Sequence, residues 1–288
     1  MRSSLIVAYF FSFIVGVIFG ESSDEDWGYG ENDGPETWRG QCQSNRRQSP
    51  VDITLRNIDL IPLPELNFIN YDYPGNLEIL NTGKTLIVTG FEKWKQRQPM
   101  LEGGALLHRY KLSQFHLHWG QNDYVGSEHA IESRYFPGEL HLVHIREDLT
   151  LEEALSIPNS IAAVSVLTLT TNYDNQGKHF EPIADKLPLL QFSGNSTRLK
   201  KFKTNSILPF TTDSFYSYEG SLTTPNCEEV VIWTIVSEPI YITVSQMNEL
   251  RKLRNSDGEI AEKNFRSLQP LNGRRILYKP SRWDRTYM

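Results

Sequence analysis

The stretches Gln-Phe-His-Leu-His-Trp-Gly (residues 114–120) and Glu-Leu-His-Leu-Val-His (residues 139–144) contain four of the chain's seven histidines. Side chains alternate between the faces of a β-strand, so His116 and His118 share a face. A neighbouring strand that carries His141 completes a set of three imidazoles. Three nitrogen ligands and one open position are typical of catalytic zinc, whereas structural zinc takes four protein ligands. We therefore predict a Zn²⁺ site formed by His116, His118 and His141.

Polar residues accompany two of these histidines at matching parity. Gln114 lies two residues before His116 and Glu139 two residues before His141, so each shares a face with a ligand. Metal-bound imidazoles donate their second N–H to such acceptors, which orients the ring. Ordinary half-buried strand histidines are the alternative, and the matched partners favour the metal site. His144 has the opposite parity, and we assign it to structure.

The first twenty residues have the pattern of a secretory signal peptide. Met1 and Arg2 precede the apolar run from Leu5 to Phe19, which is short for a membrane span. An uncleaved signal anchor is the alternative. No linker or repeat divides the remainder, so we expect one domain over residues 21–288. The chain is then secreted and extracellular, with no membrane span after cleavage.

Three further features fit an extracellular protein. Cys42 and Cys227 are the two cysteines, and in an oxidising compartment they most simply form one disulfide, with two thiols as the alternative. Asn195 begins the sequon Asn-Ser-Thr and is a candidate glycosylation site. The formal net charge of −6 opposes a nucleic-acid partner.

Most of the chain has the composition of β-strands. Segments rich in β-branched residues and bounded by turn formers predict strands at 86–90, 162–170 and 230–236. Helical periodicity is scarce. It predicts a short helix at 151–155 and a longer one at 244–253, with Ser245 as a candidate cap.

The histidine segments resemble the zinc-binding strands of α-class carbonic anhydrases of the secreted animal type. Further motifs agree with that family in the same order along the chain, and they are Trp-Gly-Tyr-Gly (27–30), Arg-Gln-Ser-Pro-Val-Asp-Ile (47–53), Gly-Ser-Glu-His (126–129), Gly-Ser-Leu-Thr-Thr-Pro (220–225) and Gln-Pro-Leu-Asn (269–272). The resemblance implies a mainly β (α+β) single domain. A large, central, twisted and mostly antiparallel sheet carries short peripheral helices.

The same resemblance implies zinc-dependent, reversible hydration of CO₂ to bicarbonate and a proton, through hydroxide on the zinc. By resemblance, Thr223 accepts a hydrogen bond from that hydroxide and donates its own to Glu128, because an ionised carboxylate only accepts. His129 and Tyr218 match a buried network around that glutamate. Secreted members often bridge the regions of Cys42 and Cys227. Sulfonamides and small anions are expected inhibitors, and a monomer is expected.

CO₂ has no net dipole, so its pocket should be apolar. The residues that match the substrate site are Val143, Ala163, Leu222, Thr224, Val231 and Trp233. Ala163 stands where a larger aliphatic side chain is usual, which should widen the pocket. Plain core packing is the alternative for Val231.

The chain departs from the fastest family members at the proton shuttle. Those members carry Asn-x-Gly-His, and here the segment reads Asn-Thr-Gly-Lys (81–84). An unperturbed lysine pKa of about 10.4 is poorly matched to proton transfer at neutral pH. We predict slow proton export that added buffer rescues. A Lys84 with a depressed pKa and a plain surface lysine are alternatives.

Two non-enzymatic hypotheses remain beside the enzyme. Carbonic-anhydrase-like domains serve as extracellular binding modules, but those typically lose a ligand histidine. A zinc-binding scaffold for matrix or mineral should carry acidic or Gly-rich repeats, which this sequence lacks.

Overall fold

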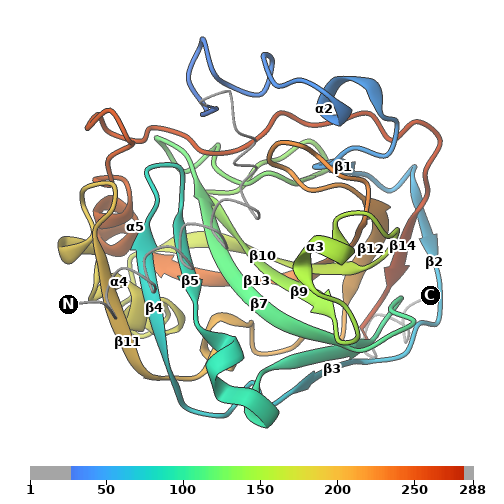
Figure 1. Ribbon diagram of the computed structural model, residues 1–288, viewed down its shortest axis with the longest axis horizontal. Helices are drawn as coiled ribbons and strands as arrows, with labels where there is room; N and C mark the ends of the chain where they lie inside the picture. The colour runs from blue at the N-terminus through green and yellow to red at the C-terminus, as the bar shows by residue number, and fades with distance from the viewer. Residues whose placement is uncertain (1–26, 282–288) are drawn as a thin grey trace.

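A computed structural model describes residues 27–281; the predicted signal peptide, residues 1–20, lies outside them. The strands of the described chain are β1 Asp52–Ile53, β2 Ile58–Leu60, β3 Leu66–Ile69, β4 Gly75–Asn81, β5 Leu86–Thr89, β6 Met100–Gly103, β7 Tyr110–Trp119, β8 Ala130–Ile131, β9 Gly138–Arg146, β10 Ile161–Thr171, β11 Ser196–Phe202, β12 Phe215–Gly220, β13 Val231–Thr243 and β14 Ile276–Lys279. Twelve of them form one twisted sheet that crosses the molecule (Figure 1).

The sheet has the order β11-β4-β5-β7-β9-β10-β13-β12-β14-β2, with β6 also on β7 and β3 on β6. Most neighbours are antiparallel, whereas β10–β13 and β14–β2 are parallel. Strands β1 and β8 form a separate parallel pair. The prediction of a mainly β domain with a large, mostly antiparallel sheet is confirmed.

The helices of the described chain are short. They are α2 Gln41–Ser44, α3 Leu151–Ala154, α4 Glu181–Ala184 and α5 Val244–Leu250, with 3₁₀ turns η1 Phe91–Arg97, η2 Gly177–His179, η3 Leu187–Leu189 and η4 Thr204–Ile207. Within residues 27–281, no helix is long and apolar enough to cross a membrane.

The predicted cap of the helix expected at 244–253 was wrong. Helix α5 begins after Thr243, whose hydroxyl accepts from the backbone N–H of Gln246 while the Gln246 side chain accepts from the Thr243 N–H. This reciprocal pair satisfies two helix-end donors. Ser245 lies inside the helix instead, and α5 ends at Leu250 rather than at Leu253.

The two faces of the sheet bury different sets of side chains. Along β9, Leu140 and Leu142 join the larger apolar cluster, whereas Val143 joins a second cluster with Ala163 and Trp233. Strand alternation places His141 on the face of Val143. The candidate metal site therefore lies on the face of the smaller cluster, against a rigid sheet.

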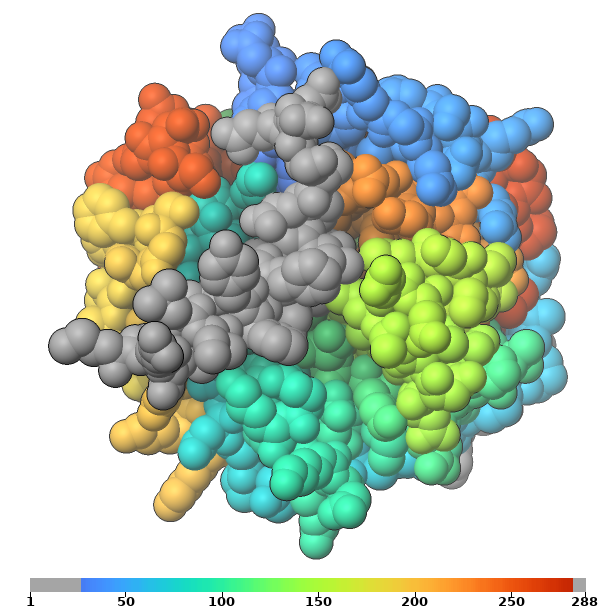
Figure 2. Space-filling model, viewed as in Figure 1, coloured from blue at the N-terminus to red at the C-terminus, as the bar shows by residue number. Residues whose placement is uncertain are grey.

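A disulfide joins Cys42 to Cys227 with an S–S distance of 2.07 Å, so that prediction is confirmed. Both cysteines pack with an aromatic cluster of Trp27, Tyr29 and Trp38, whose ring centroids lie 5.5–5.7 Å apart. Figure 2 shows the blue N-terminal segment against the orange segment around residue 227 that the disulfide joins to it.

Candidate metal centre

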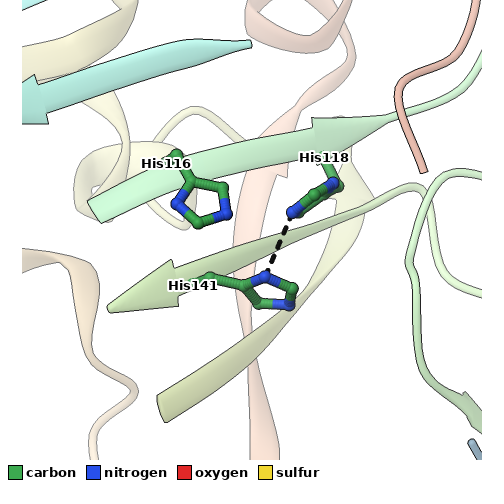
Figure 3. Close-up of side chains that lie close together, drawn as sticks. All are labelled: His116, His118 and His141. Carbon is green, nitrogen blue, oxygen red and sulfur yellow. Dashed lines mark hydrogen bonds between the residues drawn. The ribbon is translucent and has the colours of Figure 1, made fainter. Parts of the chain in front are cut away.

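Three buried imidazoles converge from two neighbouring strands (Figure 3). His116 and His118 lie on β7, and His141 on β9 stands directly opposite His116 in the strand register. The ring centroids are 4.4–5.2 Å apart. One nitrogen of each ring lies within 4.8 Å of the others. The alternation of β7 and the pairing of β7 with β9 are therefore what gather the three rings.

The second nitrogen of each ring is held by an oxygen of the protein. The pairs are His116 Nδ1 with Gln114 Oε1 at 2.9 Å, His118 Nδ1 with the Asn264 carbonyl at 2.7 Å, and His141 Nε2 with Glu139 Oε1 at 2.7 Å. Since each acceptor takes an N–H, the nitrogens toward the centre are two Nε2 and one Nδ1, all with lone pairs. Such partners orient metal-bound imidazoles.

The donor set fits zinc. Nε2 of His118 and Nδ1 of His141 are 3.0 Å apart, close to the edge of roughly 3.3 Å that tetrahedral zinc requires at about 2.0 Å per Zn–N bond. Burial lowers the pKa of all three imidazoles, well below the usual value for His116 and to about 4 for His118. The rings are therefore neutral at pH 7, which is the form that binds a metal.

Glu139 is the centre of a buried hydrogen-bond network. Its Oε1 accepts from His141 and from His129 Nδ1, both at 2.7 Å, and from the Ser165 hydroxyl at 2.6 Å. Burial alone raises the pKa of Glu139, but His129 and His141 outweigh it, so the pKa lies well below the usual value. His129 Nε2 in turn lies 2.7 Å from the Tyr218 hydroxyl, so His129 and Tyr218 join Glu139 and not Glu128, around which the sequence had placed them. The Glu139 carboxylate therefore stays ionised and holds His141 in one orientation.

A second buried carboxylate, Glu128, lies beside the triad. Its Oε2 is 3.6 Å from His118 Nε2 and 3.8 Å from His141 Nδ1, and its Oε1 accepts from the Arg266 backbone N–H at 2.8 Å. Burial raises its pKa to about 7, although His141, the Thr223 side chain and the Arg266 backbone N–H each lower it. Within residues 27–281, Glu128 Oε2 has no hydrogen-bond partner.

The residues expected to line the substrate site form one apolar wall. Ala163 on β10 lies between Val143 on β9 and Trp233 on β13 in the strand register. Val231 belongs to the same cluster, and Leu222 packs against it. The Trp233 ring centroid is 4.6 Å from that of His141, so the wall meets the triad. Thr224, 5% exposed, follows Thr223 in the loop before β13.

Lys84 and Asn195 lie outside the triad. The Lys84 ammonium is 4.3 Å from the centroid of the Trp27 ring, and its backbone carbonyl accepts from the Asn264 amide. Asn195 is exposed in the turn before β11, where its Oδ1 accepts from the Phe192 N–H at 3.2 Å.

Sequence reasoning missed partners that come from distant segments. Asn264, which holds His118, is 146 residues away and lies in no element with a recognisable pattern. Ser165, which donates to Glu139, could have been predicted, because it stands opposite His141 once β9 and β10 are paired. His144 behaves as assigned, with Nδ1 toward the Ala162 carbonyl and Nε2 toward the Tyr71 hydroxyl.

Comparison with known proteins gives consistent matches. A family model described as eukaryotic-type carbonic anhydrase matches residues 33–280. A Caenorhabditis elegans protein named "Putative carbonic anhydrase 5" is 53% identical over 98% of this chain and 90% of its own length. Human carbonic anhydrase 3 is 34% identical over 87% of this chain and 96% of its own length, and human carbonic anhydrase 7 is 35% identical over 86% and 95%.

Proposed function

The chain belongs to the eukaryotic-type carbonic anhydrase family of enzymes, and we propose that it catalyses the zinc-dependent, reversible hydration of CO₂ to bicarbonate and a proton. One observation carries this proposal. His116, His118 and His141 turn one nitrogen each toward a common point while the opposite nitrogens are held by acceptors. Among the described residues these three histidines form one such group, and catalytic zinc with three protein ligands keeps a coordination position for a small molecule.

In this proposal the three histidines hold Zn²⁺. When bound, zinc supplies a nucleophile at neutral pH by lowering the pKa of water to about 7, an effect already known from carbonic anhydrases. The ionised Glu139 keeps His141 in the tautomer with its proton on Nε2. Gln114 and the Asn264 carbonyl do the same for the other two rings.

Thr223 and Glu128 orient the attacking oxygen. Bound Zn²⁺ would place a positive charge at the triad and so favour the ionised Glu128, since an opposite charge within about 4–6 Å stabilises a carboxylate. An ionised carboxylate accepts only, so the Thr223 hydroxyl donates to it. The Thr223 oxygen then offers its lone pairs to the O–H of the nucleophile. The nucleophile is thereby aimed with a lone pair toward the substrate.

The apolar wall receives CO₂ because it offers no hydrogen bond that would favour water over the substrate. Ala163 provides a shallow position between the larger Val143 and Trp233. Leu222, Val231 and Thr224 complete this surface next to the nucleophile.

Proton export is the slow step in this proposal. Lysine at position 84 is poorly matched to proton transfer at pH 7, since its unperturbed pKa is about 10.4. Exogenous buffer of suitable pKa should carry the proton instead.

The proposal extends to the cellular setting. Cleavage after residue 20 releases residues 21–288 as a secreted, monomeric glycoprotein with a glycan on Asn195. The disulfide and the exposed sequon support this proposal. Sulfonamide and inorganic anions inhibit by taking the open metal position.

The experiment is stopped-flow CO₂ hydration by the disulfide-bonded protein, with zinc content measured on the same sample. Stoichiometric zinc with hydration that is lost in His116→Ala supports the proposal. Stoichiometric zinc without hydration, in protein that unfolds cooperatively, would replace it with the non-catalytic binding module.

A further inference from the structure

Arg266 connects the Glu128 carboxylate to the disulfide segment. Its backbone N–H donates to Glu128 Oε1 at 2.8 Å. Its side chain is 1% exposed and lies 5.9 Å from the Trp38 ring centroid. The guanidinium donates to three oxygens, each at 2.8 Å, namely Gln48 Oε1 and the backbone carbonyls of Ser49 and Cys42.

Gln48 carries the connection onward to the loop that contains Thr223. Its side chain is buried, and its Nε2 donates to the Cys227 carbonyl at 3.1 Å and to Glu229 at 3.2 Å. The carbonyls of both bridged cysteines are therefore held by the pair of Gln48 and Arg266. Cys227 also donates its N–H to the Thr224 carbonyl at 2.8 Å, so the loop is tied at both ends.

These contacts connect Glu128 to the loop that contains Thr223. Glu128, whose pKa the Thr223 side chain lowers, accepts from the Arg266 backbone N–H. Arg266 binds Gln48, and Gln48 binds Cys227, four residues after Thr223. A shift of any member would therefore move Thr223 relative to Glu128, the pair proposed above to orient the nucleophile.

A contribution to stability alone does not explain why the Arg266 guanidinium is buried at this position. Its Nε has no hydrogen-bond partner among the described residues, and the three oxygens that it binds are neutral, although the charges of Glu128 and Glu36 partly offset burial. Burying a charge with an unsatisfied donor costs free energy, and apolar replacements of such groups are often neutral or stabilising. A planar guanidinium that binds three oxygens is, however, suited to holding two segments in register.

We propose that Arg266 is a positioning residue that fixes Glu128 relative to Thr223, with Gln48 and the cysteine bridge as its fixed anchor. The inference rests on the proposed hydration activity. The Arg266 side chain would thus influence the reaction without contacting the substrate or the metal.

The first test compares Arg266→Lys and Gln48→Met with Arg274→Lys as matched control. Arg274 also donates to the backbone carbonyls of Gln48, at 2.7 Å, and of Glu219, at 2.9 Å, but it forms no hydrogen bond to Glu128 or to either cysteine carbonyl. We expect kcat/KM for CO₂ hydration to fall about tenfold in the first two variants and to stay within about twofold in the control. All three should keep stoichiometric zinc.

Comparing the loss in kcat/KM with the loss in kcat distinguishes lost positioning from partial unfolding. At low buffer, kcat reports proton export, so lost positioning lowers kcat/KM more than kcat. Partial unfolding lowers the active fraction and reduces both by one factor, and that result would overturn the proposal.

A double-mutant cycle tests the coupling itself. Cys42→Ser/Cys227→Ser is combined with Arg266→Lys. If the bridge acts through Arg266, the combined loss in kcat/KM is much smaller than the product of the separate losses. Multiplicative losses would overturn the proposal.

The rate at which dithiothreitol reduces the bridge provides a readout that needs no catalysis. Arg266→Lys and Gln48→Met should speed reduction several-fold, and Arg274→Lys should not, because only the first two release the cysteine carbonyls. Equal reduction rates in all three variants would contradict an anchoring role for Gln48 and the disulfide. If the zinc-loaded wild type does not hydrate CO₂, the proposed function itself is refuted, whatever the reduction rates are.

Discussion

The Lys84 ammonium lies over the face of Trp27, 4.3 Å from the ring centroid. An ammonium at this distance is attracted by the negative face of the ring. Trp27 is itself part of the aromatic cluster that packs against the disulfide. The residue at the shuttle position is therefore held by a rigid neighbour.

Lys84→His should raise kcat about tenfold at low buffer, because an unperturbed imidazole pKa of about 6.5 matches proton transfer near neutrality. kcat/KM should not change, since the attack on CO₂ precedes proton export. Stopped-flow rates over an imidazole series check both values, with the exposed Lys200→His as control. A wild-type kcat independent of buffer concentration would contradict slow export.

Gln114→Leu should weaken zinc binding by about 10–100-fold, because His116 Nδ1 loses the acceptor that orients its ring. Competition with a chromophoric chelator measures the Kd. The exposed Gln43→Leu is the control and should bind zinc like the wild type. Equal affinities in all three proteins would show that this hydrogen bond does not tune the site.

Ala163→Leu should lower kcat/KM by about tenfold or more, since the added atoms enter the wall between Val143 and Trp233. Ala162→Leu is the matched control, because its side chain lies on the opposite face in the larger cluster. Both substitutions overpack the core and cost roughly 1–3 kcal/mol. Equal losses of kcat/KM would refute a substrate role for Ala163.

His144 should make the protein less stable in acid. Burial lowers its pKa to about 4 from 6.5, while the unfolded chain keeps the higher value. Above pH 6.5 both states are neutral and nothing is lost; as pH falls toward 4, only the unfolded state gains the proton. The lost stability approaches about 3 kcal/mol at pH 4.

Urea unfolding of the wild type and of His144→Gln between pH 7 and pH 4 isolates this contribution. The variant should show the shallower fall in unfolding free energy, and the exposed His108→Gln should follow the wild type. Parallel curves for all three proteins would assign acid sensitivity to other groups.

Strand parity predicted which histidines converge, because a period of two is a local property of β7 and β9. It also placed Gln114 and Glu139 correctly relative to His116 and His141 as structural neighbours. Local pattern was less successful in predicting the cap of helix α5. Thr243 and Ser245 both carry hydroxyls, and Gln246 three residues after Thr243 is the signal that distinguishes them.

Contacts that depend on sheet order lay beyond such reasoning. The parallel pairing of β10 with β13 joins segments whose separation in sequence has no period to detect. Arg266 likewise reaches Gln48 across 218 positions, and only the folded chain shows that it does.

The Asn264 carbonyl on His118 has a consequence for biosynthesis. The three histidines leave the ribosome more than a hundred residues before Asn264. A nascent chain therefore carries all three histidines long before the His118 ring is oriented. Loss of such a partner weakens metal binding by about 10–100-fold, so we expect the full affinity for zinc only once Asn264 has joined the fold. A chain truncated before Asn264 should therefore bind zinc more weakly although all three histidines are present.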